Sequence, residues 1–328
     1  MLFLVFALSG LCGVTTARPE VSRTQTISLQ AGWNAVFLEV EPQTKLPAEL
    51  FAQTPVDIVA TFFPSRTPIF LPRNPVDHPW QEENWHVWYA TARADAFLSN
   101  LHQVLGNQGY LIYSKSDFVL KLVGKPGYKP VRWQTDSLNL VGFSVDPQSP
   151  PTFQKFFAGA KAHEGGRVFR LEGGKWALVR DASNTRMRAG EACWVECKGA
   201  SDYQGPVSVK LPMSNALEFG PQSEDLPIEI FNQGTATTSI SVEVMTGAAN
   251  LPLTRVSKDL NTLRISYPAL TGAITIRDLP SGQSETLRLS PRRELMVADT
   301  QSALLKVSDG AGVQIWIPVN ASRPVASQ

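Results

Sequence analysis

The sequence contains little of what catalysis, metal binding and nucleic-acid binding usually require. Its 328 residues include only 3 cysteines and 4 histidines, and the formal net charge is +1. So few histidines leave few positions for acid–base catalysis. No block of lysine or arginine provides the basic surface that nucleic-acid binding needs. We therefore expect no nucleic-acid partner, no bound metal and no cofactor.

The sequence motifs of common enzyme classes are also missing. Residues 142–146 lack the second glycine of a nucleophile elbow. Residues 124–126 are Gly-Lys-Pro and do not continue as a phosphate-binding loop. Residues 163–166 are His-Glu-Gly-Gly, without the helix and second histidine of a zinc protease. We expect a protein that is not an enzyme, and a secreted hydrolase is the least favoured alternative.

The N-terminus has the features of an export signal. Residues 1–14 are apolar and uncharged, and they are too few to span a bilayer as a stable anchor. Thr15 and Ala17 place small side chains at the two positions that a signal peptidase inspects. We predict a signal peptide at residues 1–17, no transmembrane segment after its removal, and an extracellular, cell-surface or periplasmic location.

Cysteine usage predicts a fold that does not depend on disulfides. Removal of the signal would leave only Cys193 and Cys197. In a strand, residues four apart lie on one face about 13 Å from each other, beyond the ~7 Å between Cα atoms that a disulfide tolerates. We expect two free thiols.

The strongest internal signal is a duplication. Residues 32–43 align with residues 137–148 at a constant offset of 105, and both stretches end in an acidic residue followed by Pro-Gln. In both stretches alternate residues are apolar, which predicts a half-buried strand. These residues are Val36, Leu38 and Val40 in the first stretch and Val141, Phe143 and Val145 in the second.

Later parts of the two stretches correspond as well. Trp85 aligns with Trp176, residues 109–112 with 192–195, and an alternating strand at residues 118–122 with one at 207–211. The predicted repeats span residues 24–130 and 131–213. The first repeat carries an extra segment at about residues 64–84, which we expect to be a surface excursion, and an amphipathic helix is predicted at residues 92–105.

The last third of the chain has a different sequence pattern from the two repeats. Residues 214–322 contain about seven short alternating strands separated by turn residues, which is typical of an immunoglobulin-like sandwich. A polar tail follows at residues 323–328. The predicted fold is mostly β: two tandem duplicated β-rich modules with short helices, followed by an immunoglobulin-like β-sandwich.

Short motifs in these three parts resemble those of a known group of proteins. Gly32-Trp33-Asn34 and Gly109-Tyr110-Leu111-Ile112 resemble the "GWN…GYWV" β-modules of exported bacterial proteins, and residues 217–220 and 230–234 resemble the start of their immunoglobulin-like domains. The order of parts is similar to the N-terminal region of large exported bacterial surface proteins, which often continue into laminin-G-like jelly-roll domains. The resemblance implies structural modules and supplies no catalytic residue.

One group of aromatic residues is the candidate binding site. Trp80, Trp88 and Tyr89 lie within or beside the extra segment of the first repeat, and aromatic faces are common in sugar-binding sites. Trp80 has no counterpart in the second repeat and lies among polar residues, so it is the best candidate for an exposed ring. A core role is the competing interpretation. The acidic and histidine residues at 77–86 match no metal-site spacing and are interpreted as a polar loop.

These observations favour a non-catalytic exported surface or secreted protein that acts as a scaffold, spacer or adhesion module. The alternative is a carbohydrate- or matrix-binding module that uses the aromatic residues of the first repeat. Its expected partner is a polysaccharide or a surface matrix.

Overall fold

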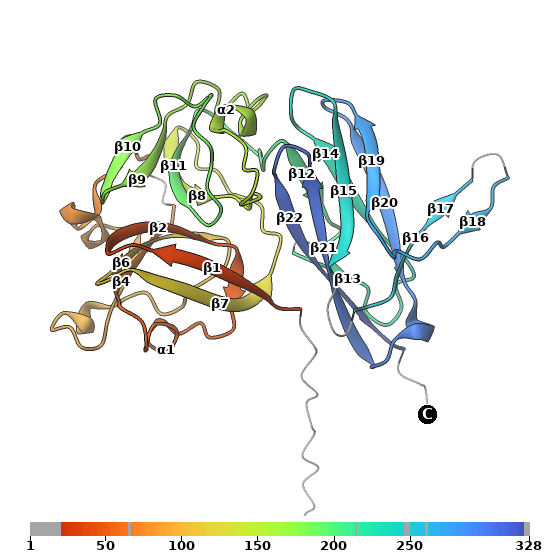
Figure 1. The fold of residues 1–328 in the computed structure, drawn as a ribbon, viewed down its shortest axis with the longest axis horizontal. Helices are drawn as coiled ribbons and strands as arrows, with labels where there is room; N and C mark the ends of the chain where they lie inside the picture. Colours follow the sequence, from red (N-terminus) through yellow and green to blue (C-terminus); the bar gives the residue numbers. More distant parts are fainter. Residues whose placement is uncertain (1–20, 65–66, 214, 246–249, 260–261, 325–328) are drawn as a thin grey trace, which may run out of the picture.

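The fold is mostly β, as the sequence predicts, and it has three parts: two modules stacked one above the other and a sandwich beside them (Figure 1). The computed structural model describes residues 21–64, 67–213, 215–245, 250–259 and 262–324. The predicted signal peptide lies outside the described residues, as does most of the predicted tail.

Two sheets make up the first module. We call them the cover sheet, with strand order β1-β7-β3, and the first core sheet, with order β2-β6-β4-β5; all neighbouring strands are antiparallel. The strands are β1 (Arg23–Leu29), β2 (Gly32–Leu38), β3 (Val40–Pro42), β4 (Val56–Phe62), β5 (Trp85–Tyr89), β6 (Gln108–Ser114) and β7 (Phe118–Pro126).

The second module contains one sheet, the second core sheet, with order β8-β11-β9-β10. Its strands are β8 (Ser137–Gly142), β9 (Val168–Glu172), β10 (Lys175–Leu178) and β11 (Ala192–Cys197). The two core sheets have the same topology: β2, β4, β5 and β6 occupy the same places in the first sheet as β8, β9, β10 and β11 occupy in the second. The registers agree too: Val36 lies opposite Tyr110 as Val141 lies opposite Cys193, and Phe62 lies opposite Trp85 as Leu171 lies opposite Trp176.

The first core sheet is a middle layer with a hydrophobic core on each face. One core fills the space to the cover sheet and includes Val36, Leu38 and Leu120. The other fills the space to the second core sheet and includes Phe62, Trp85 and Trp194. All seven residues of β4 are buried, because both faces of this strand are covered.

Helices are short. They are α1 (Pro47–Leu50), α2 (Phe153–Phe156) and the 3-10 turns η1 (Pro75–Asp77), η2 (Pro79–Gln81), η3 (Ala96–Leu98) and η4 (Arg293–Leu295). None of the helices in the described ranges is long and apolar enough to cross a membrane. α2 covers the outer face of the second core sheet, where Phe153 and Phe156 join Cys193 and Val195 in a third core.

The predicted helix at residues 92–105 is wrong. Only η3 forms there, and Phe97 is 82% exposed. The segment instead runs along β5 and bonds to it: Val87 N donates to Asn100 Oδ1 at 2.6 Å, and Tyr89 N donates to Ser99 Oγ at 3.0 Å. Satisfying the open edge of a strand outweighs a moderate helical pattern, because unpaired buried backbone groups are costly.

The third part is an immunoglobulin-like sandwich of two sheets (Figure 1). One sheet has the order β12-β14-β20-β16, and the other has the order β13-β22-β21-β15-β19, in which β13 runs parallel to β22. The strands are β12 (Val207–Lys210), β13 (Leu217–Glu218), β14 (Leu226–Asn232), β15 (Thr238–Met245), β16 (Leu253–Arg255), β19 (Ile274–Leu279), β20 (Ser284–Pro291), β21 (Thr300–Asp309) and β22 (Gln314–Ser322). A small hairpin, β17 (Ser257–Lys258) and β18 (Ile265–Ser266), projects from the sandwich.

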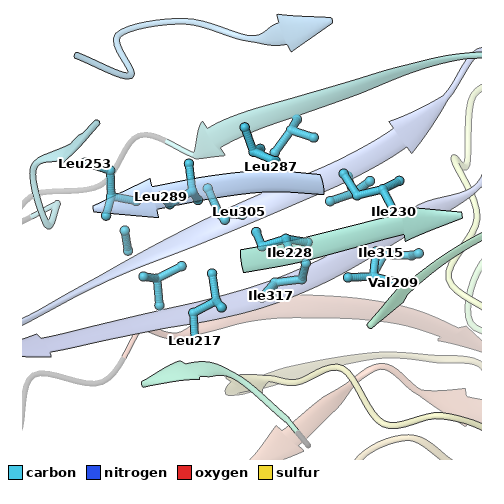
Figure 2. Close-up of a cluster of buried hydrophobic side chains, with 14 of the residues drawn as sticks. Val209, Leu217, Ile228, Ile230, Leu253, Leu287, Leu289, Leu305, Ile315 and Ile317 are labelled. Carbon is cyan, nitrogen blue, oxygen red and sulfur yellow. The ribbon is translucent and has the colours of Figure 1, made fainter. Parts of the chain in front are cut away.

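The sandwich core is aliphatic and continuous between the two sheets (Figure 2). Ile228, Ile230 and Leu289 come from one sheet, and Leu305 and Ile317 come from the other. Burial alternates along β14 and β20, as expected for strands with one face on a core.

The boundary between the second module and the sandwich differs from the predicted one at residue 213. The duplication predicts that β12 closes the second repeat, but β12 pairs with β14, and its Val207 and Val209 lie in the sandwich core. The sandwich therefore begins at β12. The alternating pattern identifies the strand correctly, but it carries no information about which sheet the strand joins.

Cys193 and Cys197 are free, buried and both in β11, as predicted. Burial raises the pKa of both thiols, to about 11 for Cys197. Trp194, between them, joins the core on the other face of the sheet.

Candidate functional site

The three aromatic residues predicted to form an exposed binding face are buried. Trp80, Trp88 and Tyr89 are 4%, 7% and 7% exposed. They do not share a face, because Trp88 packs on Phe51 in the core below the cover sheet, whereas Trp80 and Tyr89 belong to the core between the two core sheets. The expectation of an exposed Trp80 is therefore wrong, and the sugar-binding hypothesis loses the surface on which it relied.

The described residues 67–84 of the extra segment connect the two modules. Ile69 N donates to Ser137 Oγ at 2.7 Å, and Leu138 N donates to Ile69 O at 2.7 Å. Trp176 N donates to Asn74 Oδ1 at 2.9 Å. Together with the burial of Trp80, these contacts contradict the expected surface excursion. Proline and charge content misled the prediction, because the prolines here begin tight 3-10 turns that bring Trp80 into the core.

The acidic and histidine residues at 77–86 do not converge. His86 Nδ1 lies 3.3 Å from Asn100 O, Glu82 forms an ion pair with Arg73, and His78 stacks on Trp80. No group of three or more potential metal ligands occurs among the residues that the structure describes.

A cleft of about 780 Å³ lies where the two modules and the sandwich meet. This volume falls within the usual range for a small-molecule site. Its walls come from the first module (Phe37, Glu39, Phe62, Phe63), the connecting segment 127–134, the second module (Asn139 to Ser144) and the sandwich (Val313 to Trp316).

The connecting segment explains why a cleft exists here. At the offset of 105, residues 128–134 correspond to β1, which in the first module forms a seven-residue ladder with β7. The connecting segment forms no ladder. Instead the side chain of Gln204 replaces a strand partner: Val131 N donates to its Oε1 at 2.5 Å, and its Nε2 donates to Val131 O at 3.0 Å. Side-chain contacts thus take the place of a strand ladder, among them those between Asn139 and Gln134, and the cleft lies beside the segment.

A closed ring of four contacts borders the cleft, and three of its four residues line it, namely Glu39, Ser144 and Trp316. Arg23 pairs with Glu39 at 2.6 Å, and Ser144 Oγ donates to Glu39 Oε2 at 3.1 Å. Trp316 Nε1 donates to Ser144 Oγ at 3.2 Å, and the Arg23 guanidinium lies 4.4 Å from the centre of the Trp316 ring. The ring joins the first module, the second module and the sandwich. The Glu39 side chain is only 5% exposed, and its negative charge is balanced by the neighbouring Arg23.

The remaining lining is aromatic, amide-rich and basic. Trp133 is half-buried and oriented by neighbours: its Nε1 donates to Tyr203 O at 2.6 Å, and its ring lies 4.2 Å from that of His163. Lys129 and Arg132 are exposed. His163 lies behind Trp133, outside the cleft lining, and burial lowers its pKa.

The cleft presents groups that can bind a ligand: ring faces, side-chain amides and basic side chains. Its described lining residues include no histidine or cysteine, and the Ser144 hydroxyl is engaged by Glu39 and Trp316. Sequence reasoning missed Arg132, Trp133 and Ser144. The sequence contains one sign of the cleft: Trp316 alternates with the apolar residues Ile315 and Ile317, so its ring points away from the sandwich core.

No protein-family model and no curated protein matches the chain. Several solved structures share a weak likeness with it, and two of them illustrate how weak it is. One is the CsuC–CsuE chaperone–tip adhesion subunit pre-assembly complex from archaic chaperone–usher Csu pili of Acinetobacter baumannii, with 16% identity over 36% of this chain and 56% of that chain and a TM-score of 0.21. The other is PapD-like domain 7 of human CEP192, with 10% identity over 37% of this chain and 87% of that chain and a TM-score of 0.22. The match thus spans just over half of the first of these chains. At such TM-scores the likeness supports no functional argument, and the assignment of the sandwich rests on its own strands and core.

Proposed function

We propose that the protein is a non-catalytic exported scaffold or adhesion unit in which two duplicated modules and a sandwich act as one rigid body. The observation that carries the proposal is the ring of Arg23, Glu39, Ser144 and Trp316, which joins all three parts through partly buried polar contacts. Domains of one chain generally move relative to one another unless their interface is large and hydrophobic. Here a hydrophobic core lies between the two modules, and Val313 of the sandwich packs into the core of the second module. Export and a surface or periplasmic location follow from the predicted signal peptide.

A short backbone ladder strengthens the link to the sandwich. Gln314 N donates to Ser144 O at 3.1 Å, Asp146 N donates to Gly312 O at 2.8 Å, and Val145 forms an isolated antiparallel bridge with Val313. The turn between β21 and β22 therefore pairs through its backbone with residues 144–146 of the second module. Gly312 has φ +99°, and a Cβ there would lie 2.1 Å from Ser149 O, so the turn is shaped for this contact.

The duplication is supported by contacts between equivalent residues. Phe37 packs on Gly142, and Glu39 accepts a hydrogen bond from Ser144; each pair is separated by the offset of 105. A residue meets its own equivalent where a two-fold axis passes through an isologous interface. The two modules are thus arranged like a symmetric dimer within one chain.

Calorimetric unfolding of the mature chain tests the rigid-body proposal. We expect one cooperative transition, with calorimetric and van't Hoff enthalpies in agreement. The double variant S144A/W316F, which removes two contacts of the ring, should separate the transition of the modules from that of the sandwich.

The matched control is Ser281→Ala. This variant removes a serine hydrogen bond to Gly234 O that lies entirely within the sandwich, so it should leave a single transition. Two resolved transitions in the unmodified chain would contradict a rigid body.

A further inference from the structure

We propose that the cleft at the junction binds a short acidic oligosaccharide, one whose sugar rings carry carboxylate groups. This inference goes beyond the scaffold role and places recognition at residues different from the buried aromatic group of the first module. It rests on three features of the lining: its charge, its polar and aromatic groups, and the shape of its strand edge.

The charge of the lining favours an anion. Glu39 is neutralised by Arg23 at 2.6 Å. Lys129 and Arg132, both on the connecting segment and both exposed, have no ion-pair partner in the described part of the chain. Only three residues apart, these two cations can approach neighbouring carboxylates of one ligand. Arginine additionally suits a planar carboxylate, which it can bind with two parallel hydrogen bonds.

The polar and aromatic groups favour a sugar. The side-chain amides of Gln134 and Gln314 line the cleft and have no hydrogen-bond partner within the described ranges. Amides of this kind can donate to and accept from hydroxyl groups at once. Phe63, Trp133 and Trp316 are half-buried and offer ring surface for the apolar faces of a sugar.

The aromatic rings are also held in fixed orientations. Trp133 is fixed by Tyr203 O and His163, and Trp316 by Ser144 and Arg23. Because these rings are already fixed in the free protein, less side-chain conformational entropy is lost when a ligand binds.

The strand edge argues against an extended peptide. β8 is an edge strand of the second core sheet and lines the cleft. Its outer edge is occupied at the start, where Leu138 N donates to Ile69 O, and just beyond the end of the strand Ser144 O accepts from Gln314 N. The stretch between them is too short for a peptide to add as a further strand, a mode that needs a row of open backbone groups.

Isothermal titration calorimetry of the mature chain at low ionic strength tests the proposal. The probes are hexagalacturonate, the neutral maltohexaose and a hexaglutamate peptide. We expect saturable binding of hexagalacturonate, at least tenfold weaker binding of the other two probes, and a decrease in affinity as salt increases. The variant K129Q/R132Q should weaken hexagalacturonate binding by about tenfold or more.

The matched control is K258Q/R277Q, which removes the same charge from exposed positions on the sandwich. It should bind like the unmodified chain. An equal loss in both double variants would show non-specific attraction and overturn the proposal. So would the absence of hexagalacturonate binding by folded protein, whereas hexaglutamate binding as tight as that of the sugar would identify an acidic protein partner instead.

Discussion

The two core sheets share strand order and register, yet they are covered in different ways. In the first module, the strand that follows the core sheet is β7, which folds back and builds the cover sheet with β1 and β3. In the second module, the strand that follows is β12, which leaves and becomes part of the sandwich. The outer face of the second core sheet is covered instead by α2, by loops and by Val313 of the sandwich.

This difference links the cleft to the assembly of the chain. Once β12 belongs to the sandwich, the counterpart of β1 has no strand to pair with. The connecting segment is then held by side-chain contacts, among them those of Gln204, and the sandwich contacts the second module through the bridge of Val145 and Val313. The placement of β12 in the sandwich thus accounts for the missing strand partner of the connecting segment, beside which the cleft lies.

The interface between the two core sheets is asymmetric in side-chain size. Where equivalent positions meet, Phe37 faces Gly142, and Gly109 faces Ala192. Two phenylalanines cannot occupy the same space at such an axis, so a large residue in one module requires a small one in the other.

The largest effect should come from the centre of the interface between the two core sheets. Trp194 is 2% exposed, and its ring lies 5.5 Å from Phe62, 6.3 Å from Trp85 and 6.2 Å from Trp176. We expect Trp194→Ala to lower the free energy of unfolding by about 3–5 kcal/mol, measured by urea denaturation. Trp194→Phe should cost less, because the indole N–H has no partner in the described part of the chain. A loss below about 1 kcal/mol for the alanine variant would show that the two sheets are not closely packed.

The next effect should separate the buried part of the extra segment from its exposed part. Trp80→Ala removes a ring that lies 4.8 Å from that of Trp33, and we expect a loss of about 3 kcal/mol. Phe70, in the same segment, is 63% exposed, and Phe70→Ala should change stability by no more than about 0.5 kcal/mol. Equal effects of the two substitutions in urea denaturation would contradict the core role of Trp80.

Sequence patterns predicted the strands well because alternation depends on local sequence. Val36, Leu38 and Val40 lie in one core, and Cys193 and Cys197 lie apart in one strand, as expected. Contacts between residues far apart in the sequence were not predicted. Nothing local to β12 shows that its partner is β14, and nothing in Gln204 shows that its amide replaces a strand. The cleft depends on both, so no contiguous motif could reveal it.

A smaller effect should come from the asymmetric contact of the two modules. A Cβ at Gly142 would lie 2.2 Å from Cγ of Phe37. We expect Gly142→Ala to cost about 1–3 kcal/mol by overpacking, and to cost less in a Phe37→Ala background, where the ring is absent. A methyl group added at Gly272 would meet no atom within 4 Å beyond its chain neighbours, so Gly272→Ala serves as the control with little change. Additive costs of G142A and F37A in a double-mutant cycle would show that the two residues do not meet.

The smallest effect concerns pH and the aromatic cluster that covers only the second core sheet. His163 is 5% exposed, its Nδ1 lies 2.9 Å from Glu196 O, and its Nε2 lies 2.9 Å from Ser201 Oγ. Burial lowers the pKa of His163 below its ordinary value of 6.5. As pH falls through 6.5, the unfolded chain therefore binds a proton that the folded chain does not, and stability decreases until the lowered pKa is reached. His163→Gln should remove this slope between pH 7 and pH 5, as seen in urea denaturation curves recorded across that range. Asp309, whose pKa is raised by burial, acts in the opposite direction but is present in both proteins, so it cancels in their difference. Identical slopes for the two proteins would show that His163 is not held neutral behind Trp133.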